Sequence, residues 1–339
     1  MNKLTNKKDF IGIDISKDVL DVSVIGPETK VGFQDLKVKN DISGFEKVTS
    51  WLTKLGKPLN DCLFCMEHTG TYGLLFFAWL AQKEIDFCVE PGLQIKRSLG
   101  ITRGKNDKVD ARRIADYART HREKLKTFEL PTNLILQLKQ LLTYREQCVK
   151  MRTSLKNSLK HHLQYQQVSG LTSISERISM QIHEQDQIVA DIEKQILEVI
   201  ESDAQTKKNL ELARSVKGIG LIIAAFMLVS TNNFSSFENG RKYACFAGIA
   251  PFENVSGSSI RGKKKVSHLG NRTIKTLLSN GANSAAKWDP QLRKYYQRKQ
   301  QEGKDHKLIM NAIANKLIHR VFAVVNRQSP YVQIFEHNF

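Results

Sequence analysis

Short apolar runs and amphipathic stretches alternate along the first third of the chain. Two β-branched runs, at 10–16 and 20–26, predict a pair of strands joined by a tight turn. A third strand near 30–38, at the edge, would complete an antiparallel meander. Apolar residues at helical spacing in 43–56 then predict a helix, which Gly56 ends.

The pattern then changes to alternating strands and helices. Apolar runs at 62–67 and 86–91 predict strands, and the run at 73–82 between them predicts a helix. A further helix is expected after the segment 100–107, continuing through about Thr120. Because strands followed by helix–strand alternation are typical of a mixed α/β sheet, we predict an α/β domain at 1–128.

A different period begins after Pro131. Over 134–159, and again over 178–199, apolar residues recur at intervals of three and four. The segment between these stripes, 168–173, contains a glycine and interrupts the pattern. We therefore predict two long helices that form an antiparallel coiled-coil hairpin over 129–206.

The first of these two helices also carries a row of cations. They are Arg145, Lys150, Arg152, Lys156 and Lys160. Such a face binds the phosphates of a nucleic acid, or it is solvated while the hairpin acts as a spacer that packs on itself. Both interpretations stand on the sequence alone.

The remaining segment, 207–339, is predicted to be mainly helical. It begins with a helix end, a glycine turn at 217–220 and an apolar helix. A loop rich in glycine, serine and lysine follows at 254–270. Two amphipathic helices come last, at 272–288 and 307–327, and a polar connection at 297–306 lies between them.

The charge balance indicates an anionic partner. The 339 residues carry a formal net charge of +18, and the isoelectric point is near 9.6. This length accommodates two or three domains. A positive excess of this size favours a polyanion, although charge alone does not distinguish DNA, RNA and an acidic membrane surface.

Several features predict a cytoplasmic protein without a membrane partner. No uninterrupted apolar stretch reaches the length of about 18 residues that spans a bilayer. Residues 1–10 lack the apolar core of a signal peptide. The five cysteines are odd in number and scattered, and Cys62 and Cys65 would point to opposite faces of one strand. We interpret all five as reduced, apolar packing residues.

Four carboxylates in the first third have the placement of a metal-binding nuclease site. Asp14 and Glu67 each end an apolar strand, where burial of an acid is costly unless it binds something. Asp107 and Asp110 lie three residues apart at a helix start and share one face. Carboxylates of this kind hold Mg²⁺, or Mn²⁺ in its place, for phosphoryl chemistry. Alternatively, Asp107 and Asp110 only stabilise the helix amino terminus, which leaves Asp14 and Glu67 unexplained.

The glycine turn is a second candidate for nucleic-acid binding. It consists of Lys217, Gly218, Ile219 and Gly220, and it resembles the turn of a helix-hairpin-helix. Its glycines would let backbone N–H groups approach a phosphate at the amino terminus of the next helix. The alternative is an ordinary turn between helices, which uses glycine for its backbone conformation.

The loop at 254–270 offers a nucleophile. Ser256 lies beside Gly257 and is followed by cations and a histidine: Arg261, Lys263, Lys264, Lys265, His268 and Arg272. Cations near a hydroxyl stabilise charge that develops on a phosphate under attack, so a covalent phosphoserine route is open. The alternative is a flexible loop that only contacts phosphates.

Taken together and in this order, these segments resemble one protein family. The segments are 11–22, 66–73, 103–118, 217–220 and 246–278, and they span nearly the whole chain. The family is that of the insertion-sequence-110 transposases, which are DEDD serine recombinases related to Piv-type DNA invertases. Three departures are the histidine at position 68, a loop at 254–270 that is richer in lysine than in many members, and a tail after Val325 that resembles nothing in the family.

This resemblance implies a fold and a set of site residues. The fold would be a RuvC-like (RNase H-like) domain at 1–128, a coiled-coil linker at 129–206, and a mainly helical transposase domain at 207–339 with a helix-hairpin-helix. The metal-binding tetrad would fall on four carboxylates, and the nucleophile on a serine. These residues are Asp14, Glu67, Asp107, Asp110 and Ser256.

The resemblance also implies partners and a reaction. A structured noncoding bridge RNA would pair with target and donor DNA, so base pairing rather than side chains would set the sites. Ser256 would attack a DNA phosphate and leave a phosphoserine and a free 3′ hydroxyl. Because two DNA duplexes must be brought together, we expect a dimer or tetramer in the prokaryotic cytoplasm, associated with the nucleoid.

Three functions are consistent with these features. The leading hypothesis is an RNA-guided, site-specific DNA recombinase that uses Mg²⁺-assisted serine chemistry. The alternative is a hydrolytic RuvC-like DNA endonuclease, specific for a junction or structure, without a covalent serine intermediate. A nucleic-acid-binding module that has lost its activity is the third hypothesis, and the intact tetrad and Ser256 argue against it.

Overall fold

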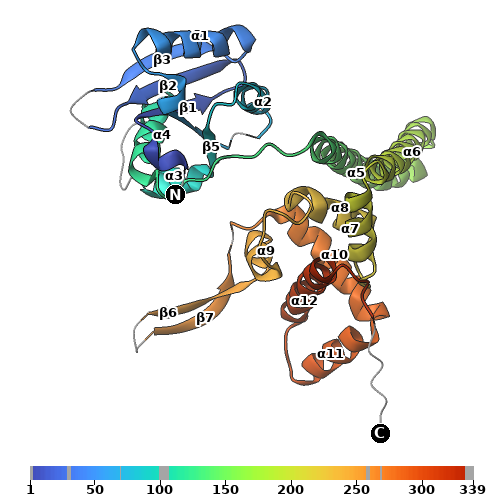
Figure 1. Ribbon diagram of the computed structural model, residues 1–339. Helices are drawn as coiled ribbons and strands as arrows, with labels where there is room; N and C mark the ends of the chain where they lie inside the picture. The colour runs from blue at the N-terminus through green and yellow to red at the C-terminus, as the bar shows by residue number, and fades with distance from the viewer. Residues whose placement is uncertain are drawn as a thin grey trace. The chain divides into compact units, whose positions relative to one another are not determined.

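The chain forms two compact units, Met1–Leu130 and Pro131–Phe339. The structure, a computed structural model, describes residues 3–28, 32–68, 70–98, 107–256, 260–267 and 269–332 (Figure 1). For residues 3, 253–256 and 260–265 it describes the backbone alone.

Unit 1 is built on a mixed five-stranded sheet, as the sequence predicts. Its strands are β1 (Asp9–Ile15), β2 (Val19–Ile25), β3 (Gln34–Lys39), β4 (Cys62–Glu67) and β5 (Phe87–Glu90). The strand order is β3-β2-β1-β4-β5. The first three strands form the antiparallel meander, and β4 and β5 extend the sheet in parallel with β1.

Helices cover both faces of this sheet (Figure 1). One face packs against α1 (Ile42–Lys54) and α2 (Leu74–Gln82), and the other against α3 (Gly92–Ser98) and α4 (Asp107–His121). Two short 3₁₀ turns, at Lys3–Asn6 and Leu59–Asp61, complete the unit. The sequence pattern predicts α1, α2 and α4 but not α3. That helix is short and begins directly after Pro91, where only a strand end is expected.

Strand β1 separates its side chains cleanly between the two faces. Ile11, Ile13 and Ile15 pack into the core beneath α1 and α2, whereas Phe10 packs into the core beneath α3 and α4. Gly12 therefore faces α4, and a Cβ at this position would lie 2.1 Å from the carbonyl oxygen of Ala111. Helix α4 thus rests with its backbone directly on β1, and the next residue on this face is Asp14.

The cysteines behave as the sequence predicts. All five are free, and Cys62, Cys65, Cys88 and Cys148 are buried. Cys62 lies in the core beneath α1 and α2, and Cys65 lies in the core on the opposite face. Burial raises the pKa of the Cys62 thiol to about 12, which keeps it protonated near neutral pH.

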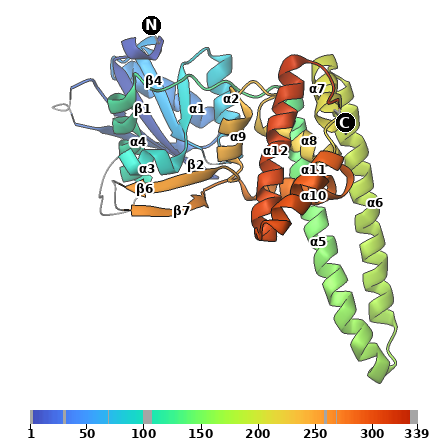
Figure 2. The same cartoon turned by 90° about the horizontal axis from the view of Figure 1, so that it is seen from below.

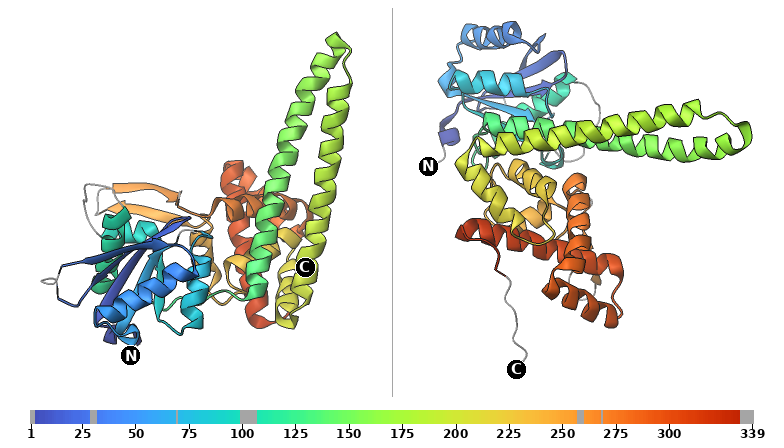
Figure 3. Two further views of the ribbon diagram at one scale, coloured as in Figure 1. Left: turned by 90° about the horizontal axis from the view of Figure 1, so that it is seen from above. Right: turned by 90° about the vertical axis from the view of Figure 1, so that its right-hand side faces the viewer.

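Unit 2 begins with two long helices that lie side by side (Figure 3). They are α5 (Asn133–Ser169) and α6 (Ser173–Glu201), and Gly170 joins them with a left-handed backbone, φ 70°. Ion pairs cross between the helices: Arg145 Nε donates to Glu193 at 2.8 Å, and Arg152 pairs with Asp186. These contacts hold the hairpin together along part of its polar face.

Shorter helices and a two-stranded ribbon follow. The helices are α7 (Ala204–Arg214), α8 (Leu221–Ser230), α9 (Gly240–Phe246), α10 (Arg272–Trp288), α11 (Pro290–Gln301) and α12 (His306–Arg327). The antiparallel ribbon consists of β6 (Pro251–Ser256) and β7 (Ile260–Val266), and it extends away from the helices of its unit (Figure 2).

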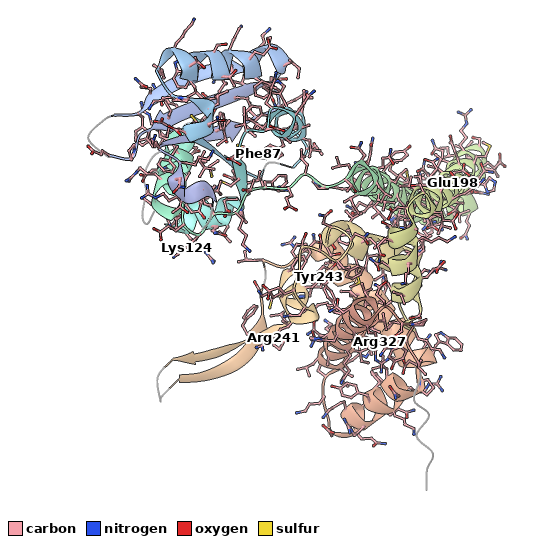
Figure 4. All side chains as sticks on the ribbon, viewed as in Figure 1. Phe87, Lys124, Glu198, Arg241, Tyr243 and Arg327 are labelled. Carbon is pink, nitrogen blue, oxygen red and sulfur yellow. The ribbon has the colours of Figure 1, made fainter. Side chains whose placement is uncertain are left out.

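A single hydrophobic core joins the base of the hairpin to these shorter helices. It runs from Ile135 on α5 and Ile200 on α6 to Val325 on α12. Tyr243 lies among these helices, with Phe237, Phe246 and Phe322 around its ring (Figure 4). Its hydroxyl is 2.7 Å from Ser230 Oγ, so its polar end is satisfied. The boundary between a linker and a transposase domain at 206/207 stays a prediction.

Helix α12 is long and apolar enough to cross a membrane, judged by length and composition alone. It is the one such helix within the described ranges. However, 56% of its apolar window is buried inside the protein. Residues from Ile309 to Val325 belong to the core of unit 2, so packing within the unit accounts for the apolar sequence of this helix.

Two sequence predictions in this unit are wrong. The segment 254–270 is not simply a loop, because β6 and β7 pair across the connection 257–259. β-Branched residues such as Val255 and Ile260 on either side of a three-residue, glycine-containing link are typical of a hairpin. Half of the polar connection predicted at 297–306 also falls within α11, which begins at Pro290 behind the N-cap Asp289 and ends at Gln301.

Asp289 fixes the junction between α10 and α11. Its side chain is 0% exposed, its Oδ1 accepts from the backbone N–H of Leu292 at 2.9 Å, and its Oδ2 accepts from Arg320 Nη1 at 2.6 Å. Arg320 comes from α12 and also stacks 4.7 Å from the Tyr331 ring centroid. One buried ion pair therefore ties α10, α11 and α12 together.

We predict that Arg320→Ala lowers the free energy of unfolding by about 3 kcal/mol, because it leaves the Asp289 carboxylate buried without its cation. Urea denaturation followed by circular dichroism measures this change. Arg298→Ala is the matched control: it breaks a 3.8 Å pair with Glu302 on an exposed surface, and its effect should stay below about 1 kcal/mol. Equal effects of the two variants would contradict this role for Asp289.

Candidate functional site

A row of carboxylates crosses the sheet of unit 1. Asp14 on β1 pairs with Asp21 on β2, and Glu67 on β4 pairs with Glu90 on β5. The β1–β4 ladder pairs Ile13 with Met66, which places Asp14 beside Glu67 in the next position. Residues in lateral register share one face of a sheet, so the four acids lie on the face that α3 and α4 cover.

Helix α4 adds two more carboxylates to this face. Asp107 and Asp110 occupy its first turn, and the contact between Gly12 and Ala111 holds that part of the helix against β1. Asp110 Oδ1 accepts a hydrogen bond from Arg113 Nη1 at 2.8 Å. The helix therefore delivers its acidic end to the position of Asp14, although acids also favour a helix amino terminus for its dipole alone.

The electrostatics of Asp14 show that these groups act on one another. The pKa of Asp14 is raised to about 6, first by burial and then, in decreasing order, by the charges of Asp110, Asp107, Glu67 and Asp21. The four carboxylates predicted from the sequence are thus within electrostatic range of one centre. Within the described ranges, however, no group of three or more Asp, Glu, His or Cys residues lies close enough to enclose a metal ion.

The donor chemistry of this set fits a hard divalent cation. Every predicted ligand is a carboxylate, the ligand type that Mg²⁺ and Mn²⁺ prefer. The raised pKa of Asp14 reflects burial and, after it, repulsion by neighbouring carboxylates, and a cation would offset both. The carboxylate of Glu67 extends over Gly92, where a Cβ would lie 1.8 Å from Glu67 Oε1, so this glycine leaves room for the ligand. Asp14, Glu67, Asp107 and Asp110 are the residues that would hold the ion.

Asp35, which the sequence interpretation misses, ties α4 to the edge strand β3. Its Oδ1 accepts from Arg112 Nε at 2.9 Å and from Ser23 Oγ at 2.9 Å, and its Oδ2 lies 3.0 Å from Lys108 Nζ. The hydrogen bonds from Arg112 lower the pKa of Asp35 to about 2, with smaller contributions from Lys108 and Ser23. Because Lys108 and Arg112 flank Asp110 in the sequence, this cluster fixes the acidic end of α4.

Glu90, the outer member of the row, also has a built environment that the sequence interpretation misses. Tyr117 on α4 donates to Glu90 Oε2 at 3.2 Å, and Gln94 on α3 donates to the Tyr117 hydroxyl at 2.9 Å. Burial raises the pKa of Glu90, and burial together with the Glu90 charge raises the pKa of Tyr117 to about 12. The network joins β5, α3 and α4. Its signal in the sequence is that Glu90, like Glu67, ends an apolar run.

The predicted cations of α5 divide into two groups. Arg145 and Arg152 pair with acids of α6, and Lys150 pairs with Glu146 one turn before it on α5. Lys156 and Lys160 are exposed, and neither forms an ion pair with any residue that the structure describes. The first three therefore have structural partners, and the last two remain the stronger candidates for contact with phosphate.

The glycine turn has one glycine that packing requires and one that it does not. Gly218 has φ 97°, and a Cβ there would lie 2.6 Å from the carbonyl oxygen of Gly281 on α10. Gly220 is the N-cap of α8 and faces open space. Lys217 Nζ donates to the carbonyl oxygen of Trp288 at 3.5 Å. Gly218 thus serves the contact with α10, while Gly220 leaves the amino terminus of α8 accessible.

The ribbon of unit 2 carries the predicted nucleophile. Ser256 is the last residue of β6 and pairs with Ile260, so its backbone borders the connection to β7. Strand β7 carries Arg261, Lys263, Lys264 and Lys265 in its sequence, and their side chains, like that of Ser256, lie outside the described atoms. His268 also lies outside the described residues. Arg272, exposed, opens α10 behind the N-cap Asn271.

Comparison with known proteins gives matches over both units. One family model, described as transposase, matches residues 11–166, and a second, described as transposase of the IS116/IS110/IS902 family, matches residues 210–297. The chain is 27% identical over 331 residues to the pilin gene-inverting protein of Moraxella bovis, which covers 96% of this chain and 98% of that protein. It is 25% identical over 262 residues to the transposase for insertion sequence element IS1111A of Coxiella burnetii, covering 67% and 68%.

Solved structures give a weaker likeness. The RuvC structure of Thermus thermophilus matches with 15% identity and a TM-score of 0.26, over 35% of this chain and 99% of that chain.

We predict that Asp14→Asn stabilises the metal-free protein above pH 6. In the wild type Asp14 titrates near 6 in the folded state and near 3.8 when exposed, so folding becomes less favourable as pH rises between these values. After allowance for solvent screening, the asparagine variant should gain about 1 kcal/mol at pH 8 and nothing at pH 3. Thermal melts in EDTA measure the difference.

The exposed Asp18→Asn is the control for this measurement and should leave the melting temperature unchanged at both pH values. Adding Mg²⁺ at pH 8 should raise the melting temperature of the wild type more than that of Asp14→Asn. A metal-free Asp14→Asn variant that is less stable than the wild type at pH 8 would contradict the repulsion described at this site.

We predict that Asp35→Asn loosens α4 without removing any carboxylate of the row. The substitution weakens the charged hydrogen bonds from Arg112 and Lys108, so local opening of the helix should become easier by about 1–2 kcal/mol. Hydrogen exchange followed by mass spectrometry should show that residues 107–121 exchange faster in the variant than in the wild type, whereas exchange in α1 is unchanged. Asp61→Asn, which breaks the 2.9 Å pair of Asp61 with the exposed Lys8, is the control and should leave α4 protected.

Proposed function

Because the chain belongs to the IS110 family of transposases and is a DNA recombinase, we propose that it cleaves and rejoins DNA through a phosphoserine at Ser256. In this proposal a divalent cation is held by four carboxylates: Asp14, Glu67, Asp107 and Asp110. The substrate is double-stranded DNA at target and donor sites. The observation that carries the proposal is the meeting of Asp14 and Glu67 with the acidic end of α4 on one sheet face.

The carboxylates supply the setting for phosphate chemistry. A divalent cation held by Asp14, Glu67, Asp107 and Asp110 would neutralise phosphate charge and polarise the P–O bond. Asp14 must be ionised to serve as a ligand. At a pKa of about 6 it is still mostly ionised near pH 7, so protons compete only weakly with a cation there and more strongly as the pH falls below 6. Asp35, Arg112 and Lys108 hold α4 in place, so Asp107 and Asp110 stay beside Asp14.

The covalent step belongs to Ser256. Its Oγ bonds to phosphorus while the bond from phosphorus to the 3′ oxygen breaks, the hydroxyl proton leaves to solvent, and the 3′ oxygen takes up a proton. A 3′ hydroxyl of the partner strand then attacks the phosphoserine, which restores a phosphodiester and frees the serine. The register of the ribbon supports this role, because Ser256 ends β6 opposite a strand rich in arginine and lysine.

Guidance by a structured bridge RNA is part of the same proposal. The net charge of +18 supports two polyanionic partners. Candidate contacts are Lys156, Lys160, Lys217 and the open amino terminus of α8 at Gly220. We interpret α7 and α8 as a helix-hairpin-helix and α5 and α6 as a coiled-coil linker. Unit 1 is interpreted as RuvC-like, since its antiparallel meander is extended by two parallel strands.

The assembly and its location complete the proposal. Joining two DNA duplexes needs at least two copies of Ser256, so we infer a dimer or tetramer in which a metal site of one protomer can serve the serine of another. The enzyme would act at the nucleoid in a prokaryotic cytoplasm and make no use of a membrane.

One observation favours a second candidate, a hydrolytic RuvC-like endonuclease. All the row carboxylates and the acidic end of α4 lie in unit 1, whereas Ser256 lies in unit 2. In that case activated water would cleave the DNA, and Ser256 would only contact a phosphate. The two candidates differ in whether a bond forms between protein and DNA.

We predict that a DNA substrate nicked next to the cleavage site traps a protein–DNA adduct that survives denaturing electrophoresis. Ser256→Ala should abolish the adduct, because no other atom replaces Oγ. Ser258→Ala, a serine two positions further, should keep it. Asp14→Ala or removal of Mg²⁺ should slow adduct formation by at least about 100-fold, because phosphate charge is no longer neutralised.

Mass spectrometry of the trapped peptide identifies the modified serine. An adduct that persists in Ser256→Ala would refute the serine assignment. Free DNA ends without any adduct in the wild type would favour the hydrolytic alternative.

A further inference from the structure

A cavity with both polar and apolar walls lies between α10 and α12 of unit 2, outside the residues considered so far. Its volume is about 400 Å³, and Ile249, which precedes the ribbon, forms part of its wall. A cavity of this size is at the small end of ligand pockets, so it suits one nucleotide and excludes a duplex.

The charge of the cavity favours an anionic ligand. Lys275 from α10 and Lys307 from α12 line it, together with His306. None of the residues that the structure places in its wall is acidic. A phosphate entering the cavity would therefore meet cations from two helices and no opposing carboxylate.

The neutral groups in the wall suit a base. Asn280, Asn283 and Asn311 each offer both a donor and an acceptor, the combination that reads the edge of adenine and other bases. Asn311 is held in place because its Nδ2 donates to the carbonyl oxygen of Ile249 at 2.9 Å. The apolar Ile249 and Met310 add a surface for the flat face of a base.

The position of the cavity connects it with the ribbon. Ile249 is anchored by Asn311, and β6 begins two residues later at Pro251. Ser256 then lies five residues along an extended strand, a separation of about 17 Å. A nucleotide in the cavity would thus be bound at the base of the ribbon that carries the proposed nucleophile.

We propose that this cavity binds one unpaired nucleotide, with its phosphate at Lys275 and Lys307 and its base at the asparagines. The proposal rests on the proposed function for the presence of nucleic acid, but it does not depend on the serine chemistry. Both a single strand of DNA and an unpaired segment of RNA present the chemistry that the cavity recognises. The binding experiment distinguishes them.

The test measures binding of three labelled oligonucleotides of one sequence to the full-length protein in EDTA: single-stranded DNA, single-stranded RNA and duplex DNA. The double variant Asn280→Ala/Asn283→Ala should weaken binding of at least one single strand by about tenfold, without changing its salt dependence, because no charge is lost. Duplex binding should stay unchanged. Lys275→Ala should lower the salt slope of the same single strand by about one.

Matched controls separate the cavity from the surface. Gln297→Ala removes an exposed carboxamide from α11, and Lys208→Ala removes an exposed cation from α7. Gln297→Ala should bind all three oligonucleotides like the wild type. Any change in affinity caused by Lys208→Ala should be the same for the single strands and the duplex. Weaker binding of the asparagine double variant to single-stranded DNA alone, to single-stranded RNA alone or to both identifies the source of the nucleotide. Each of these three results supports the proposal.

A second measurement keeps the proposal testable if a variant does not fold. Single strands carrying photoreactive 5-iodouracil should crosslink the wild-type protein within 275–283 or 306–314. Crosslinks confined to other segments would overturn the proposal, as would well-folded asparagine variants that bind all three oligonucleotides within about twofold of the wild type. Because EDTA suppresses catalysis, these results stand apart from any failure of the Ser256 adduct assay.

Discussion

The contact between Gly12 and Ala111 is the constraint on which the candidate site depends. No side chain fits between β1 and α4 at this point, because a Cβ on Gly12 would overlap the helix backbone. The close approach fixes both the height and the position of α4 over the sheet. As a result, the first turn of α4 ends beside Asp14, and an acidic helix end meets an acidic strand position.

The approach of α4 to β1 concentrates negative charge around Asp14, and contacts on either side of α4 hold the carboxylates in position. Burial and the neighbouring carboxylates raise the pKa of Asp14, so ionising this group in the folded protein costs free energy. Asp35 holds Arg112 on one side of α4, and Tyr117 holds Glu90 on the other. The folded site thus carries a cost in stability that a bound cation would offset. Such stored repulsion is common where function, not stability, selects the residues.

The sequence predicts the parts of the site that have a local signal. Asp14 and Glu67 stand out because each is a polar residue at the end of an apolar strand, and Asp107 and Asp110 because their spacing places them on one helix face. Asp35 gives no such signal, since its bond to Arg112 joins residues 77 positions apart. Asp21 enters the row only through the register of β1 and β2, which spacing along the chain does not determine.

The same distinction separates the two uses of positive charge in the chain. Arg145, Arg152 and Arg320 stabilise the fold. The first two pair with acids of α6, and Arg320 pairs with Asp289 at the junction of α10 and α11. Lys156 and Lys160 lack such partners among the described residues, and the wall of the α10–α12 cavity contains lysines but no acid. A face lined by carboxylates repels the phosphates of DNA, so binding DNA there requires cations elsewhere in the chain to supply the attraction. The number of basic residues in the sequence therefore overstates how many are available to bind phosphate. Cations that pair with an acid in the fold and cations that do not look alike until their partners are known.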